Sequence, residues 1–287
     1  MNVMLPEKNK IKKKQLYIYI SIIAICIICV IIAFYVQFYA RIDIGRLIGI
    51  NPEGEFGKKS EEEIQILKTD FNQIFTNNIE NDEGQNNNKK EEQDKQLVYT
   101  GYEKKESKLN SFDLEVHIPH INIKSEIVDG YNKEIEDVFL KIANNVLESE
   151  NQNIIFTVEY VANVQDGILS VMIRSNLKEG SKAQKVIIQT YNYDLRNNKE
   201  ITLEEVLKIE NLDKEVIQNT INEEIAIEQK KAEDLISLGY NIYKRDKNSE
   251  IYKIENSTEF YLTNNTLYIV YAYGNATDTS EMDLIII

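Results

Sequence analysis

Outside one long apolar run, the sequence has no cysteine, because its only two cysteines, Cys26 and Cys29, lie within that run. No disulfide is therefore expected to stabilise a folded domain, and a cysteine nucleophile is excluded there. Tryptophan is absent, and the chain has 3 prolines and 2 histidines. His117 and His120 are three residues apart in an extended segment, so their rings should point to opposite faces. Without a third histidine, the sequence predicts no zinc site.

The motifs of several enzyme classes are also missing. The sequence contains no G-x-S-x-G elbow, no Walker A loop and no G-x-G-x-x-G, so we expect no cofactor. The net charge is -14, and the acidic part lacks the clustered lysine and arginine that phosphate contacts need. This argues against a nucleic-acid partner and suits a basic protein partner. Carboxylate pairs such as Glu204 with Glu205 keep a carboxylate-dependent hydrolase open as an alternative.

The long apolar run extends from Leu16 to Tyr39 and contains no charged residue. A helix of this length is about 36 Å long, enough to cross a hydrocarbon core of roughly 30 Å. Five lysines precede the run within residues 1–15, which predicts a cytoplasmic N-terminus. The sequence therefore predicts a cytoplasmic tail over 1–15 and a transmembrane helix over 16–40 that binds the lipid bilayer. The protein should lie in the cell membrane, single-pass, with everything after the helix extracellular.

A cleaved signal peptide is the competing interpretation of the same run. The apolar region of a signal peptide has ~7–15 residues and ends at a site with small residues. This run is longer, and Phe38-Tyr39-Ala40 puts a bulky aromatic where a small residue is needed. We therefore expect the run to be kept as an anchor.

A stalk is predicted over residues 41–96. Ser60 and Glu63 form a capping-box motif that begins a helix, and apolar residues follow on one helical face. They are Ile64, Leu67, Phe71, Ile74 and Phe75. The opposite face is acid-rich, so packing on the domain or on a second copy is favoured over packing on the bilayer. Residues 77–96 have almost no apolar side chains and predict a flexible tether with a reach of roughly 25 Å.

Residues 97–287 predict one α+β domain. Alternating or β-rich patterns indicate strands at 112–118, 154–164, 168–175, 185–194, 259–263, 267–273 and 282–287, and helical patterns occur at 135–146, 203–209 and 212–238. Asp166-Gly167 is a two-residue hairpin motif. Pro119 should end or edge the first strand, and Gly239 should close the last helix. Hairpin-linked strands with segregated helices predict a twisted antiparallel sheet with helices on one face.

Three segments of this domain resemble a known family. Residues 190–206 are similar to the pattern YxxDLxxGKxxTLxDLF, residues 258–271 resemble FYxTxxGLxFYFxxYE, and residues 116–121 resemble VxYPQI. In this order they resemble the extracytoplasmic domain shared by lysozyme-sensing anti-sigma-V factors and PdaC-type peptidoglycan deacetylases. The resemblance implies a binding or sensing domain for a lysozyme-like protein or cell-wall glycan. It comes here without the deacetylase catalytic domain, and the cytoplasmic tail is too short for a sigma-binding segment.

Candidate binding residues come from the tyrosine-rich strands, because tyrosine is enriched at interfaces and stacks on sugars. They are Tyr191, Tyr193, Asp194, Tyr268, Tyr271 and Tyr273. The same residues can equally maintain the fold. Asp194 can accept backbone hydrogen bonds in a turn. Along 267–273 alternate residues face opposite sides, and we expect one of the two sets to be buried.

These observations favour a non-enzymatic, membrane-anchored extracytoplasmic binding or sensing module of a Gram-positive-type bacterial envelope. Two alternatives stay open. One is a carboxylate-dependent cell-wall hydrolase or deacetylase accessory. The other is a structural envelope protein that self-associates through the helix predicted at 60–75.

Overall fold

The computed structural model describes residues 59–75, 96–149, 153–273 and 281–287, all within a compact unit from Glu55 to Ile287. The predicted cytoplasmic tail, the transmembrane helix and nearly all of the predicted tether lie outside these ranges. Within the described part, no helix combines the length and the apolar character needed to cross a membrane. The described part confirms the α+β class, with a six-stranded sheet, a three-stranded sheet and helices.

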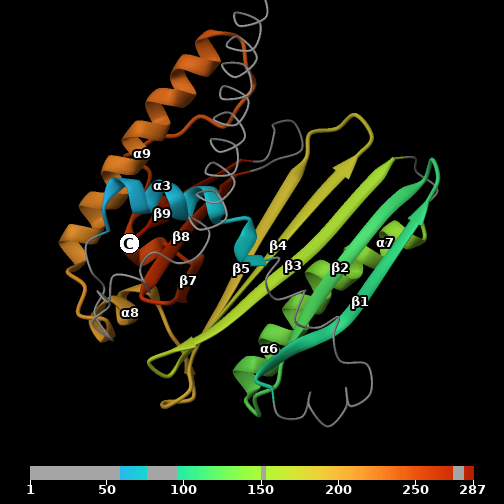
Figure 1. Cartoon of the computed structure of the whole chain (residues 1–287), viewed down its shortest axis with the longest axis horizontal. Coiled ribbons are helices and arrows are strands. Elements are labelled where there is room, and N and C mark those ends of the chain that lie inside the picture. Colours follow the sequence, from blue (N-terminus) through green and yellow to red (C-terminus); the bar gives the residue numbers. More distant parts are fainter. Residues whose placement is uncertain (1–58, 76–95, 150–152, 274–280) are drawn as a thin grey trace, which may run out of the picture. The chain divides into compact units, whose positions relative to one another are not determined.

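The larger sheet is mixed, not purely antiparallel as expected. Its strands, in spatial order, are β1 (Val98–Lys108), β2 (Phe112–Ile121), β3 (Ile154–Gln165), β4 (Ile168–Glu179), β5 (Lys185–Asp194) and β6 (Lys199–Glu200) (Figure 1). Only β2 and β3 pair in parallel. A parallel pair needs a long crossover, usually helical. That crossover is a helical segment formed by α6 (Glu126–Ile135), the π-helical turn η1 (Glu136–Leu140) and α7 (Lys141–Leu147).

The first hairpin of this sheet differs from the sequence prediction. Strand β1 was not predicted, and Pro119 does not end β2, which continues to Ile121. Pro119 lies opposite Thr100, where the β1–β2 register shifts between Thr100 and Tyr102. Proline is tolerated at such bulges. A Cβ atom on Gly101 would lie 2.8 Å from the Cβ atom of His120, so this bulge requires glycine.

The β3–β4 hairpin is confirmed at the predicted position. Asp166 and Gly167 both have positive φ, 50° and 80°, as a two-residue type I′ turn requires. The turn joins Gln165 to Ile168, which face each other in the register. It fixes which β3 and β4 side chains share each face.

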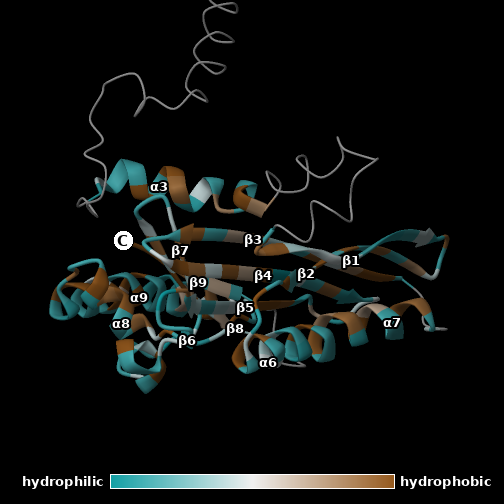
Figure 2. Cartoon of the chain, turned by 90° about the horizontal axis from the view of Figure 1, so that it is seen from below, coloured by the Kyte–Doolittle hydropathy of each residue, from teal (hydrophilic) through white to brown (hydrophobic). Residues whose placement is uncertain are grey.

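Along β4 both faces of the larger sheet are buried, and this overturns the expectation of helices on one face. Val171 and Ile173 lie in a first core, between the sheet and the α6–α7 crossover, whereas Met172 lies in a third core on the opposite face. The six residues from Ile168 to Ile173 are all buried. Figure 2 shows α6 and α7 on one side of the sheet and α3 (Glu61–Asp70) on the other.

The smaller sheet is antiparallel and contains β7 (Phe260–Thr263), β8 (Thr266–Tyr273) and β9 (Glu281–Ile286). One face packs on α8 (Leu203–Ile209), α9 (Lys214–Ser237) and the 3₁₀ turns η2 (Glu250–Tyr252) and η3 (Ile254–Asn256), forming a second core. The predicted capping box of Thr202 and Glu205 begins α8. The expectation of one buried β8 face is wrong. Leu267 and Ile269 lie in the second core, and Tyr268 and Val270 lie in the third.

The predicted helix after Ser60 packs on this domain. Ser60 and Glu63 form the expected capping box. Phe71 and Phe75, just beyond α3, are 2% and 0% exposed and lie in the third core between the two sheets. The Phe71 ring lies 5.8 Å from the Tyr268 ring. The apolar helix face predicted from the sequence therefore packs on the domain.

Candidate functional site

The structure does not bring the six predicted binding residues together. Tyr191 and Tyr193 lie in the first core, Tyr271 and Tyr273 in the second, Tyr268 in the third, and Asp194 in the turn that ends β5. Each is at most 7% exposed. A shared ligand-binding surface made of these side chains stays a prediction, and their burial favours a role in the fold.

Asp194 illustrates that fold role. Its Oδ1 atom accepts hydrogen bonds from the backbone N–H groups of Arg196 and Asn197 at 2.9 and 3.0 Å. Its Oδ2 atom accepts one from the side chain of Asn197 at 2.6 Å. The side-chain and backbone hydrogen bonds of Asn197 hold the pKa of Asp194 below its ordinary value. The carboxylate thus closes the turn between β5 and β6, as the sequence suggested.

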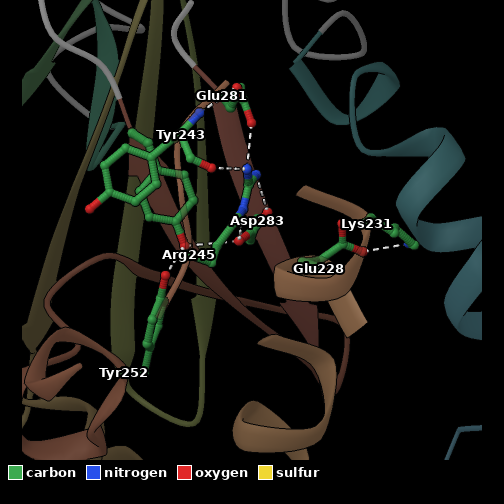
Figure 3. Close-up of polar contacts among 8 residues, drawn as sticks. Glu228, Lys231, Tyr243, Arg245, Tyr252, Glu281 and Asp283 are labelled. Carbon is green, nitrogen blue, oxygen red and sulfur yellow. Dashed lines mark hydrogen bonds and ion pairs between the residues drawn. The ribbon is translucent and has the colours of Figure 1, made fainter. Parts of the chain in front are cut away.

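A cluster of buried charges forms instead around Arg245, in the segment between α9 and η2 (Figure 3). Arg245 donates to Asp283 from Nε at 3.0 Å and from Nη2 at 2.8 Å. Its Nη1 atom donates to Glu281 at 2.6 Å and to the backbone carbonyl of Tyr243 at 2.9 Å. The side chains of Arg245 and Asp283 are 6% and 3% exposed. Burial alone would lower the pKa of Arg245, but hydrogen bonds to Asp283 and Glu281 outweigh burial and raise it.

Tyrosine hydroxyls extend this cluster toward the surface of the domain. Tyr273 donates to Oδ2 of Asp283 at 2.8 Å, and the Tyr252 hydroxyl lies 2.8 Å from that of Tyr273. Because Tyr273 uses its proton on Asp283, Tyr252 must be the donor of the second bond. Burial, followed by the charge of Asp283, raises the pKa of Tyr273. Both phenols therefore stay protonated at neutral pH.

Tyr252 lies at the edge of a cleft with a volume of about 650 Å³. One wall is the first half of α9, with Asn219 and Asn222, and the other is the segment from Lys247 to Glu255. Gln218 joins the walls: its amide donates to the carbonyl of Tyr252 and accepts the N–H of Ile254, both at 3.0 Å. These two hydrogen bonds fix the position of one wall of the cleft relative to the other.

The cleft is lined by amide side chains, by three lysines, and by the carboxylates of Glu215 and Glu255. Lys214, Lys247 and Lys253 contribute three cations to a protein whose net charge is -14. Glu204 and Glu255 pair with Lys214 at 3.3 and 3.6 Å, so its charge is shared. Lys253 is likewise paired, with Glu250. Amide side chains offer both a donor and an acceptor, which suits ligands with many hydroxyl groups. The arrangement can therefore bind a polyhydroxylated molecule.

Sequence reasoning missed the Arg245 cluster, although one signal pointed to it. Glu281 and Asp283 are two apart on a strand, so both carboxylates project to one face. Two acids on a mostly apolar strand require a cation, and Arg245 is that partner. The histidines give no comparable site, since His120 packs its ring 5.3 Å from Tyr99. Within the described ranges, no group of three or more His, Cys, Asp or Glu residues is arranged to hold a metal.

Comparisons with known proteins return structural neighbours only. No protein-family profile matches the sequence, and no curated protein matches it. A crystal structure of a DUF3298 family protein from Pseudomonas aeruginosa aligns with 66% of this chain and 85% of its own, with 13% identity and a TM-score of 0.37. A DUF3298 member from Bacteroides fragilis aligns with 56% of this chain and 61% of its own, with 17% identity and a TM-score of 0.30.

Proposed function

We propose that this chain is a membrane-anchored extracytoplasmic module that binds or senses a ligand at the bacterial envelope, with peptidoglycan-type glycan as the ligand of the α9 cleft. The observation that carries the proposal is the cleft itself, about 650 Å³ with amide, lysine and glutamate side chains in its walls. Glycan hydroxyls match the amides, and the carboxylates of an attached peptide match the lysines. The anchor rests on the uncharged run from Leu16 to Tyr39 and the lysines before it.

Two experiments test this proposal. The full chain in lipid nanodiscs should bind soluble peptidoglycan fragments, and the variant Asn219→Ala/Asn222→Ala should weaken that binding. Lys230→Glu, on an exposed α9 position outside the cleft, is the matched control and should bind as the original protein does. Equal binding by the double variant and the original protein would remove the cleft from the proposal. Separately, a reporter fused after Ile287 should be cleaved by protease added to intact cells, and a protected reporter would reverse the topology.

A basic, lysozyme-like protein is a second candidate ligand, and it is favoured by the net charge of -14. Such a partner would bind the acidic surface rather than the lysine-lined cleft. Its binding should therefore weaken with rising salt and be unaffected by Asn219→Ala/Asn222→Ala. A pull-down with lysozyme at low and high salt separates the two ligands.

The pKa of Glu259 lends the hydrolase alternative some support. Burial raises the pKa of Glu259, and Glu134 raises it further; a carboxyl group with a raised pKa is what a general acid needs. However, Oε2 of Glu259 already accepts the backbone N–H of Thr190 at 2.6 Å, which commits it to joining β5 and β7. Turnover of peptidoglycan that is lost in Glu259→Gln would establish the hydrolase and overturn the binding proposal.

Self-association through the helix after Ser60 has less support. The side chains that would form such an interface, above all Phe71 and Phe75, are buried against the domain. Sedimentation of the full chain, with and without Phe71→Ala/Phe75→Ala, tests the alternative. If the original protein is an oligomer and the double variant is a monomer, self-association through this helix is supported.

A further inference from the structure

A crevice lies beside α3, where the helix meets the edges of both sheets. Leu67 and Ile74 form one wall, Val161 and Asn163 of β3 a second, and Tyr261 and Tyr268 of the smaller sheet a third. Its volume is about 370 Å³, within the range of small-molecule pockets. It is separate from the α9 cleft, since the two have no lining residue in common.

Tyr268 provides an unused polar group at this crevice. The residue is 3% exposed, and its ring packs between Phe71 at 5.8 Å and Tyr261 at 6.2 Å. No described residue forms a hydrogen bond with its hydroxyl, unlike those of Tyr252, Tyr271 and Tyr273 in the second core. The residue lines the crevice, so its hydroxyl is free to donate to an acceptor group of a bound molecule.

The rest of the lining defines what such a ligand contains. The walls near Tyr268 are apolar, with Leu67, Ile74 and Val161. The amide nitrogen of Asn163 already donates to the carbonyl of Leu262 at 3.2 Å, which leaves its side-chain oxygen to accept a hydrogen bond. Thr263, Asn264 and Thr266 add polar groups to the lining. The crevice therefore combines an apolar wall with several hydrogen-bonding groups, a lining that suits a short chain or ring carrying an amide.

Charge around the crevice favours a neutral ligand. Burial raises the pKa of Tyr268 to about 12, and the negative charge of Asp70 on α3 adds to this. The same charge would repel an anion. Lys59 donates to the carbonyls of Asn265 and Ile287 at 3.0 and 2.8 Å, so that nearby cation is already engaged.

We infer that this crevice is a binding site for a small neutral molecule with an apolar ring or short chain and an amide-like group, held by the Tyr268 hydroxyl and the Asn163 side-chain oxygen. Leu67 and Ile74 belong to the segment that follows the predicted anchor. A bound molecule would therefore bridge that segment and the two sheets, and would stabilise its docking. The inference goes beyond the proposed function, because it depends neither on glycan binding nor on the membrane topology.

The test uses benzamide as the probe and the full chain in lipid nanodiscs, with empty nanodiscs to correct for partition into lipid. Saturation-transfer NMR titration should show saturable binding. Tyr268→Phe, which removes only the hydroxyl, should weaken it by roughly two- to tenfold, the value of one hydrogen bond. Leu67→Trp should abolish binding by filling the crevice from α3, and Thr263→Leu should weaken it from the opposite wall. Ile66→Ala is the control, since Ile66 is 53% exposed on the same helix.

Hydrogen exchange provides the second readout. Bound benzamide should slow exchange of the α3 amides in the original protein and in Ile66→Ala, and not in Leu67→Trp. The same measurement shows whether each variant keeps α3 docked. No saturable binding above empty nanodiscs would overturn the inference, and so would unchanged affinity in Tyr268→Phe or in a folded Leu67→Trp.

Discussion

The guanidinium of Arg245 and the carboxylate of Asp283 form a two-point ion pair, with N···O distances of 3.0 and 2.8 Å, that joins the segment after α9 to β9. Both side chains are nearly inaccessible to water, at 6% and 3% exposure. Glu281 accepts a further hydrogen bond from Arg245, and Tyr273 donates one to Asp283. Each charged group in the cluster thus has an opposite charge and hydrogen bonds, which is the condition under which buried ions are tolerated; one guanidinium faces two carboxylates.

Removing one partner of this pair should be strongly destabilising. In Asp283→Ala, the guanidinium of Arg245 keeps one carboxylate but loses its two-point partner, and Tyr273 loses its acceptor. We expect a loss of about 3–5 kcal/mol in the free energy of unfolding. Urea unfolding of the full chain, followed by tyrosine fluorescence because tryptophan is absent, measures it.

Two further variants test whether the loss of stability comes from burial of the ion pair. Lys231→Ala breaks an exposed ion pair with Glu228 in the same region, 2.6 Å long, and should cost at most about 1 kcal/mol. Arg245→Met/Asp283→Leu replaces the buried pair by apolar side chains and should recover part of the loss seen in Asp283→Ala. If Asp283→Ala is no more destabilising than Lys231→Ala, the cluster does not stabilise the fold.

Local patterns predicted the individual elements well. Strand β5 and helix α8 have the predicted bounds, and Asp166-Gly167 forms the expected turn. These features depend on apolar alternation, helix capping and turn residues within a few positions of one another, so they can be predicted from the local sequence. The same holds for the turn bonds of Asp194, whose partners are two and three residues away.

Long-range pairing was not predictable in the same way. The parallel pairing of β2 and β3 depends on the α6–α7 crossover, and no local pattern distinguishes it from an antiparallel neighbour. The two buried faces of β8 follow from the docking of Phe71, nearly 200 residues earlier in the chain. Strand β1 was missed because Gly101 and its register shift interrupt the alternation. The Arg245 cluster depends on these same contacts, and Tyr273 is its one residue that the sequence singled out. Tyr268, also predicted, lines the separate crevice beside α3.

The segment after α3 should be held by its two phenylalanines. Phe75→Ala removes a side chain that is 0% exposed and that packs 4.2 Å from the guanidinium of Arg174. We expect a cost of about 3–5 kcal/mol and faster hydrogen exchange across α3. Ile66→Ala removes an exposed side chain from the same helix and should change neither. Equal exchange in the two variants would show that the third core does not hold α3.

The carboxyl group of Glu259 should make stability fall as pH rises. Burial raises its pKa in the folded state, so the folded protein binds this proton more tightly than the unfolded chain. The stabilisation is therefore complete below the unfolded pKa, about 4.3, and is lost as pH rises through the folded value. Glu259→Gln keeps an oxygen for the Thr190 N–H and carries no charge. It should remove this pH dependence and be at least as stable as the original protein at pH 7, and a less stable variant there would contradict the argument.

Asp194 should show the opposite pH dependence. Its hydrogen bonds hold the pKa below the ordinary value, so the unfolded chain binds the proton more tightly. The stabilisation is present above the unfolded pKa, about 3.9, and is lost as pH falls through the folded value. Asp194→Asn keeps one acceptor for Arg196 and Asn197 and should cost less than Asp194→Ala, which loses all three bonds and about 1–3 kcal/mol. Urea unfolding of the original protein and both variants at pH 3 and pH 7 measures the free energies of unfolding. The difference between the original protein and Asp194→Asn should be smaller at pH 3 than at pH 7, and an unchanged difference would contradict this role of Asp194.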